Sequence, residues 1–298
     1  MRKINFLSIF FFLTFFSILS GKTDKTLSGP AGPLKVYVSI PPQSYFVERL
    51  GSDYVTVNVL VGKGADPHTF EPTPKQIVAV GQADVYFSIG IHFETMILKK
   101  IRGSNPRLEV ISTDAGVERL VPPRLKGYED HKNFSRVEPD PHIWLSPPLI
   151  NLQAENIYRG LIKADPENAE IYKNNYDEFL RDVEEVHARI TKLLKPHKGK
   201  SFLIFHPALG YFAETYSLVQ VAIEMEGKSP YPKQIERLIK EAGELNVNII
   251  FVEPQFDKKS AKAIAEAIGG TVVTIDPLRK NVLENLEEIA EAIEKSFK

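Results

Sequence analysis

Four of the seven histidines in this chain stand beside a proline, and three of these lie where a strand or loop is predicted to end. His68 and His142 each follow the same dipeptide, in DPHTFEPTP (66 to 74) and DPHIWLSP (140 to 147), and His206 is followed by Pro207. Proline fixes the backbone φ angle, so less ordering is needed to aim each ring. The chain has no cysteine, and three imidazoles without thiolates suit Zn²⁺ and neighbouring divalent metals. The pattern therefore predicts a metal site.

A tetrahedral site needs a fourth ligand, and a carboxylate would also offset one unit of the metal's charge. We expect Asp276 to supply it, because it ends the last predicted strand and is again followed by proline. Glu253 also ends a predicted strand, and Glu71 and Asp66 are local alternatives beside His68. With Asp276 as the ligand, Glu253 becomes a group behind the metal or a hydrogen-bond acceptor for a liganding imidazole.

The other histidines carry weaker signals. His92 follows a predicted strand end and could line the same cleft. His131 lies among charged residues in a long polar loop, and we expect it to be solvated. His187, on a charged helix, and His197, in KPHKGK, are predicted to be exposed. The metal prediction therefore depends on His68, His142 and His206.

Eight short runs rich in valine and isoleucine alternate with stretches that have helical spacing of apolar residues. Such alternation predicts parallel βαβ units. The predicted strands lie at 34 to 40, 55 to 61, 83 to 90 and 107 to 113, and then at 201 to 206, 218 to 224, 247 to 254 and 271 to 277. Each half of the chain thus has about four strands, so we expect an α/β fold of two lobes, each with a mainly parallel sheet.

The stretch between the two sets of strands is a single amphipathic segment, 166 to 197, with apolar residues at intervals of three and four. We interpret it as one long rigid helix that links an N-terminal lobe, 33 to 165, to a C-terminal lobe, 198 to 298. Ligands of open α/β sheets bind at the carboxyl ends of the strands, so the predicted metal site falls in the cleft between the lobes. The polar loop 122 to 141 leads into His142, and long loops of this kind are often functional.

The first 24 residues have the pattern of an export signal. Arg2 and Lys3 precede the apolar run INFLSIFFFLTFFSIL, and small residues follow it. The alternative is an uncleaved membrane anchor, and either way the folded part is expected outside the cytoplasm. A formal net charge of −1 argues against a nucleic-acid partner, which requires an excess of Lys and Arg.

Several motifs together make the chain resemble the metal-binding solute-binding proteins of bacterial ABC importers, the family of periplasmic zinc and manganese receptors. They occur in the family's order: VYVSIPPQSYFVERLG, DPHTFEPTPKQ, ADVYFSIGIHFE, DPHIWLSP, FHPALGYFAETY, EGKSPYPKQI, FVEPQF and IDPL. The resemblance implies two α/β lobes joined by a long helix, with one metal ion bound by His68, His142, His206 and Asp276.

Two features depart from this family's pattern. The loop before His142 contains only His131, whereas zinc receptors often have a histidine-rich loop there. No cysteine for lipid attachment follows the signal segment, which implies a soluble periplasmic form or an uncleaved anchor. The first departure makes the choice of metal less specific than the ligand set alone suggests.

The resemblance and the ligand chemistry together predict a non-enzymatic carrier. Three nitrogens and one carboxylate favour Zn²⁺ over the harder Mn²⁺, with Mn²⁺ and Fe²⁺ as alternatives. The implied partner is the membrane permease of an ABC importer, and we expect the receptor to be a monomer. The competing classes are an exported zinc hydrolase, for which the chain has no HExxH motif, and an adhesin. Because the long helix should resist a wide hinge, we expect only a small rearrangement on binding.

Overall fold

The first sheet has four parallel strands in the order β2-β1-β3-β4. The computed structural model describes residues 32–121, 139–224, 231–245, 247–256 and 258–298. The strands are β1 (Leu34–Val38), β2 (Val55–Val59), β3 (Val85–Ser88) and β4 (Glu109–Ser112). Parallel sheets are covered by helices on their faces, which explains the valine-rich and isoleucine-rich runs.

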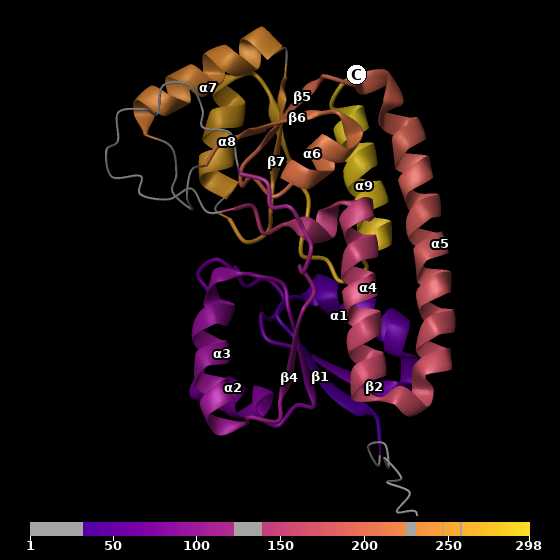
Figure 1. Cartoon of the computed structure of the whole chain (residues 1–298). Helices are drawn as coiled ribbons and strands as arrows, with labels where there is room; N and C mark the ends of the chain where they lie inside the picture. Colours follow the sequence, from indigo (N-terminus) through magenta and orange to yellow (C-terminus); the bar gives the residue numbers. More distant parts are fainter. Residues whose placement is uncertain (1–31, 122–138, 225–230, 246, 257) are drawn as a thin grey trace, which may run out of the picture.

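The second sheet repeats this arrangement. Its four parallel strands follow the order β6-β5-β7-β8, the same order as in the first sheet. They are β5 (Ser201–Ile204), β6 (Val219–Ala222), β7 (Ile249–Val252) and β8 (Thr271–Thr274). All eight predicted strands are confirmed, each a few residues shorter than the apolar run that indicated it, and Figure 1 shows the two lobes that they form.

Helices connect the strands in both lobes. In the first lobe they are α1 (Pro41–Gly51), α2 (Pro74–Val80), α3 (His92–Ser104) and α4 (Pro147–Ala164). In the second they are α6 (Gly210–Tyr216), α7 (Pro232–Leu245), α8 (Lys258–Ala267) and α9 (Val282–Lys295). Prolines at the first turns of α1, α2 and α4 favour these starts, because the missing N–H would be unpaired there in any case. Among the described helices, none is long and apolar enough to cross a membrane.

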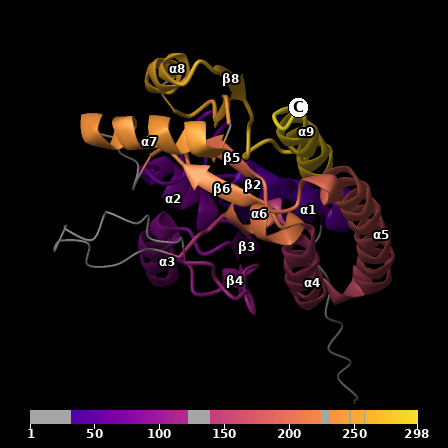
Figure 2. The same cartoon turned by 90° about the horizontal axis from the view of Figure 1, so that it is seen from above.

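The long helix predicted from 166 to 197 is present as α5 (Ala169–Leu194), 26 residues with a 3₁₀ turn at each end. At 1.5 Å per residue it is about 39 Å long. Its buried stripe includes Tyr172, Phe179 and Ile190, and the helix packs against α1 and α4 of the first lobe and against α9 of the second. Figures 1 and 2 show it running along the flank of both lobes.

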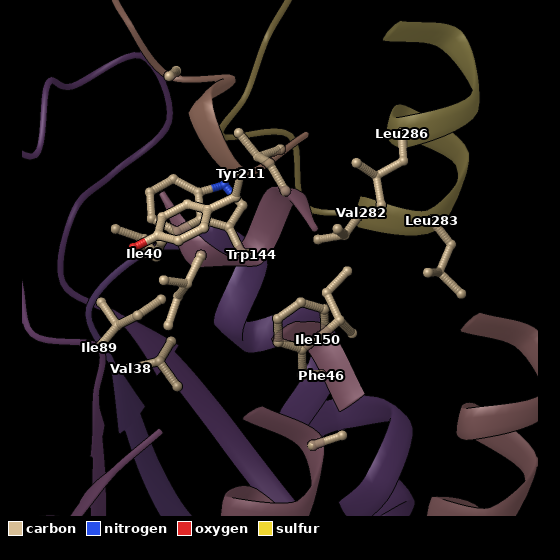
Figure 3. Packing of buried hydrophobic residues seen from close by; sticks show 14 of the residues in the cluster. Val38, Ile40, Phe46, Ile89, Trp144, Ile150, Tyr211, Val282, Leu283 and Leu286 are labelled. Carbon is tan, nitrogen blue, oxygen red and sulfur yellow. The ribbon is translucent and has the colours of Figure 1, made fainter. Parts of the chain in front are cut away.

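The lobes share one apolar core. A single cluster of buried residues extends from the first sheet through α1, α4 and α5 to α6 and α9. Figure 3 shows part of it, with Phe46 and Ile150 of the first lobe near Val282 and Leu286 of α9. A smaller cluster lies in the second lobe around α7 and α8. Because the main core is continuous, the junction between the lobes is packed and not a free hinge.

The predicted signal segment 1–24 lies outside the described residues. So does most of the loop 122 to 141, including His131, since the description resumes at residue 139. The predicted functions of both segments therefore stay predictions.

Candidate metal centre

His68, His142 and His206 come together in the structure, with their ligand nitrogens all within 4.8 Å of one another. Nε2 of His142 lies 3.4 Å from Nε2 of His68 and 3.2 Å from Nε2 of His206. Two nitrogens bound at about 2.05 Å to one tetrahedral zinc are separated by roughly 3.3 Å. Both measured separations match that geometry.

The Nε2 atoms of His142 and His206 are not hydrogen-bonded to each other. Nδ1 of His142 lies 2.7 Å from Oδ1 of Asp140, and Nδ1 of His206 lies 2.5 Å from Oε1 of Glu224. A carboxylate only accepts, so each Nδ1 carries the proton and, in the neutral ring, each Nε2 presents a lone pair. Two facing lone pairs repel unless a cation lies between them. The arrangement is that of a carboxylate–histidine–metal site.

The two Asp-Pro-His segments use the same local device to aim their histidines. Oδ1 of Asp66 accepts a hydrogen bond from the amide of His68 at 2.9 Å, and Oδ1 of Asp140 accepts one from the amide of His142 at 2.8 Å. Each turn is closed by the aspartate two residues before the ring. The repeated tripeptide is therefore a turn that presents an imidazole.

His206 is presented differently, from the end of a strand. Ile204 pairs with Ala222 in the second sheet, and each chain continues two residues further, to His206 and to Glu224. This register brings Glu224 against the imidazole, and the glutamate is buried, with 3% of its surface exposed.

Asp276 is not among the three side chains whose ligand atoms converge. Its Oδ1 accepts from the amide of Leu278 at 3.1 Å and from Nε2 of Gln255 at 3.4 Å. Asp-Pro-Leu is thus a third copy of the same turn, with Leu278 where the other two have histidine. Pro277 and Leu278 line the same cavity as the three histidines, so Asp276 directly precedes two residues of its wall.

Glu253 also lies at this cavity, at the carboxyl end of β7. It is 1% exposed, and its Oε2 accepts a 3.4 Å bond from the amide of His206, whereas Oε1 has no hydrogen-bond partner among the described residues. Burial raises the pKa of Glu253 to about 8. We expected Glu253 behind the metal or as an acceptor for a liganding imidazole. In the structure its carboxyl accepts instead from the backbone amide of His206.

Apart from Asp66 and Gln255, the rest of the cavity wall is apolar. Ile91, Trp144 and Phe256 contribute to it, and the ring of Phe256 stacks on His206 with centroids 4.9 Å apart. Burial lowers the pKa of His206 and, together with the nearby His206 ring, that of His68. The His68 side chain still has an exposed edge, whereas His142 is buried. The wall thus favours neutral imidazoles, the form that binds a metal.

A protein-family model for the periplasmic component A of the zinc-uptake complex matches residues 36–296. The chain belongs to this ZnuA family.

Individual relatives support the assignment. The chain is 27% identical over 269 residues to the high-affinity zinc uptake system protein ZnuA of Bacillus subtilis, covering 87% of this chain and 83% of that protein. A crystal structure of a ZnuA superimposes with a TM-score of 0.82 and 38% identity, covering 89% of this chain and all of that one. The laminin-binding protein of Streptococcus agalactiae, described as an adhesin with metal-transporting activity, gives a TM-score of 0.78 at 26% identity, with 89% and 100% covered.

Four further histidines and acids of this ZnuA family member lie away from the three rings. His92 is exposed at the start of α3, Glu71 is exposed in the loop after His68, and neither lines the cavity. His187 is half-buried, with its Nδ1 3.2 Å from the hydroxyl of Tyr216. His197 is also half-buried and stacks on the ring of Phe297. The prediction that His187 and His197 are exposed was therefore wrong, because helices α6 and α9 cover them.

Sequence reasoning missed Asp140 and Glu224 as partners of the rings. Asp140 was visible as the first residue of the second Asp-Pro-His triplet, and its spacing from His142 is the signal that could have identified it. Glu224 has no comparable local signal, because its role depends on the register between β5 and β6.

Proposed function

We propose that this protein is an extracytoplasmic receptor that binds a divalent metal ion, zinc in the first place, and delivers it to the permease of an ABC importer. The observation that carries the proposal is the set of three Nε2 atoms, two pairs of which have the separation that a tetrahedral ion requires. Membership of the ZnuA family and the zinc-uptake role of the Bacillus relative agree with it.

Zinc is the proposed cargo because of the donor set. Neutral imidazole nitrogens suit borderline ions, and the Irving–Williams order places zinc above both manganese and ferrous iron for such ligands. Each of two rings is backed by a carboxylate, Asp140 or Glu224, which increases the basicity of the nitrogen that faces the ion. Mn²⁺ and Fe²⁺ are the alternatives that a competition experiment has to exclude.

We propose Asp276 as the fourth ligand. Its carboxylate closes the turn at Pro277, whose ring lines the cavity, so a local shift of this turn would bring an oxygen forward. Four protein ligands would leave no open position for a reactive water, and we therefore propose a carrier and not a hydrolase. The carrier role is also preferred over adhesion, because the converging nitrogens serve metal binding.

The order of the residues along the chain assigns two of the proposed metal ligands to each lobe. We propose lobes at 33 to 165 and 198 to 298 joined by the helical segment 166 to 197, with His68 and His142 from the first and His206 and Asp276 from the second. A bound ion then bridges the lobes. We further propose a monomer that acts without a nucleic-acid partner, outside the cytoplasm, with residues 1 to 24 as signal or anchor.

The test is metal analysis of the untagged protein followed by competition of Zn²⁺ against Mn²⁺ and Fe²⁺. We expect one zinc per chain, retained against the other ions, and its loss in His206→Ala. The matched control is His187→Ala, a half-buried histidine that is hydrogen-bonded to Tyr216 at the end of α6. Asp276→Asn should weaken binding less than His206→Ala. A wild-type protein that binds no zinc, or a His206→Ala protein that binds it as well as wild type does, contradicts the proposal.

A further inference from the structure

Hydrogen bonds hold Asp140 near the metal centre at its amide, its carbonyl and its Oδ1. Its amide donates to the carbonyl of Leu120 at 2.8 Å, and its own carbonyl accepts from Nη1 of Arg119 at 3.1 Å and from the hydroxyl of Tyr211 at 3.0 Å. Its Oδ1 accepts both the amide and Nδ1–H of His142. The position and tilt of the His142 ring are therefore set by Asp140.

Two of the groups that fix Asp140 come from the second lobe. Tyr211, on α6, is 3% exposed, and its hydroxyl accepts from the amide of Leu120 at 2.9 Å while it donates to Asp140. It belongs to the buried cluster at the junction of the lobes (Figure 3). The hydroxyl of Tyr211 thus links the second lobe to Leu120, which precedes residues 122 to 138, and to Asp140, which follows them.

Gly210 leaves the space that the carboxylate of Asp140 occupies. A Cβ atom at this position would lie 2.5 Å from Oδ2 of Asp140, closer than side-chain atoms pack. The carboxylate of Asp140 fits against the start of α6 only because α6 begins with glycine, which has no side chain. Any larger residue at 210 has to displace the group that orients His142.

We propose that Gly210 and Tyr211 of the second lobe position His142 for metal binding by fixing Asp140. The inference rests on the proposed metal-receptor function and adds a structural rule to it. His142 belongs to the first lobe in sequence, yet residues of the second lobe orient its imidazole ring before a metal ion binds. Tyr211 and Gly210 are positioning residues, since neither is among the ligand groups.

The experiment compares Tyr211→Phe with Tyr216→Phe. Both tyrosines are buried on α6, at 3% and 4% exposure, and both hydroxyls have a partner, but that of Tyr216 is His187 and not Asp140. Zinc dissociation constants and release rates are measured with a competing chelator, and the site geometry is read from the visible absorption of bound Co²⁺. Hydrogen exchange at the Asp140 amide is followed in the metal-free proteins.

We expect Tyr211→Phe to raise the zinc dissociation constant by about tenfold, as for other groups that support metal ligands, and to speed release. The Co²⁺ spectrum should change, and the Asp140 amide should exchange faster. Tyr216→Phe should match wild type in all of these. Gly210→Ala is the second variant and should shift the same readings in the same direction.

Wild-type zinc affinity, Co²⁺ spectrum and amide exchange in Tyr211→Phe would overturn the inference. Equal losses in both tyrosine variants would do so as well, because they would indicate general packing of α6. If wild type itself binds no zinc, the proposed function fails, and the exchange of the Asp140 amide in the metal-free proteins still decides whether Tyr211 holds this segment.

Discussion

Glu224 lies two residues beyond the end of β6, is 3% exposed, and accepts a hydrogen bond from Nδ1 of His206 at 2.5 Å. The contact fixes the tautomer that leaves Nε2 free for a metal. It also places a negative charge behind the ring, where it increases the basicity of the ligand nitrogen. Glu224 therefore acts on the ion through His206.

Replacing this carboxylate tests that role. Glu224→Gln keeps the size of the side chain but removes the charge, so we expect the zinc dissociation constant to rise by about 10-fold to 100-fold. Glu214→Gln, on the exposed face of α6, is the control and should leave it unchanged. Chelator competition gives both constants, and an unaltered affinity in Glu224→Gln would show that the charge does not reach the metal.

The architecture could be predicted because its signals are local. Runs of β-branched residues identified all eight strands, and apolar spacing identified α5. The three histidines were also found locally, since each is next to a proline. The sequence does not show which strands pair or in which register. The position of Glu224 behind the His206 ring depends on that pairing. Glu224 faces His206 only because Ala222 is in register with Ile204.

Asp276 shows a different limit. Its place at the end of β8 was predicted, but the structure gives its Oδ1 a local function, since it closes the turn to Leu278. The same spacing in Asp66 and Asp140 could have indicated this, because all three are Asp-Pro steps in which the aspartate accepts from the residue two positions later. A strand-end carboxylate can therefore serve its own turn before it serves a metal.

Acid should weaken zinc binding only at a pH below the ordinary histidine value of about 6.5. An exposed histidine titrates near 6.5, whereas burial lowers the pKa of His68 and His206, so these rings stay neutral to lower pH. We expect a constant affinity above about pH 6.5 and a fall below it, as protons compete for the nitrogens. Chelator competition across this range measures it. An affinity that does not fall between about pH 6.5 and about pH 4.5 would contradict a site of three histidines.

The same shifts predict how the stability of the metal-free protein depends on pH. Because the pKa of each ring is lower in the folded state, the unfolded chain binds more protons as pH falls through about 6.5. The free energy of unfolding should therefore decrease with acidification in this window. Urea denaturation of the metal-free protein at several pH values gives the slope, and His187→Ala should keep it.

Substitution of Gly160 by alanine tests the packing between α4 and the first sheet. A Cβ atom there would lie 2.5 Å from Cδ1 of Ile111 and 2.7 Å from Cε1 of the fully buried Phe87. We expect Gly160→Ala to lower the free energy of unfolding by about 1–3 kcal/mol, despite the higher helix propensity of alanine. In α7, Gly243→Ala meets no atom within 4 Å and should stabilise by up to about 1 kcal/mol. Thermal unfolding of both variants compares the two effects.

Metal binding should leave the relative orientation of the lobes nearly unchanged. The shared core crosses their junction, α5 packs on both, and Lys280 of the second lobe forms an ion pair with Glu48 of the first at 2.7 Å. We expect the radius of gyration from X-ray scattering to be the same with and without zinc. A change that requires a lobe rotation of tens of degrees would contradict this expectation.

Trp144 should report the arrival of the ion. It is the only tryptophan in the chain, it lines the cavity, and its ring centroid lies 5.2 Å from that of His142. Its Nε1 donates to the carbonyl of Pro277 at 2.8 Å, so it also senses the turn that has to shift if Asp276 becomes a ligand. We expect zinc to change its fluorescence with one equivalent per chain. His206→Ala should abolish the change, and Asp276→Asn should reduce it if the turn moves. A fluorescence signal that is the same in Asp276→Asn as in wild type would place the response at His142 alone and leave Asp276 outside the coordination of the metal.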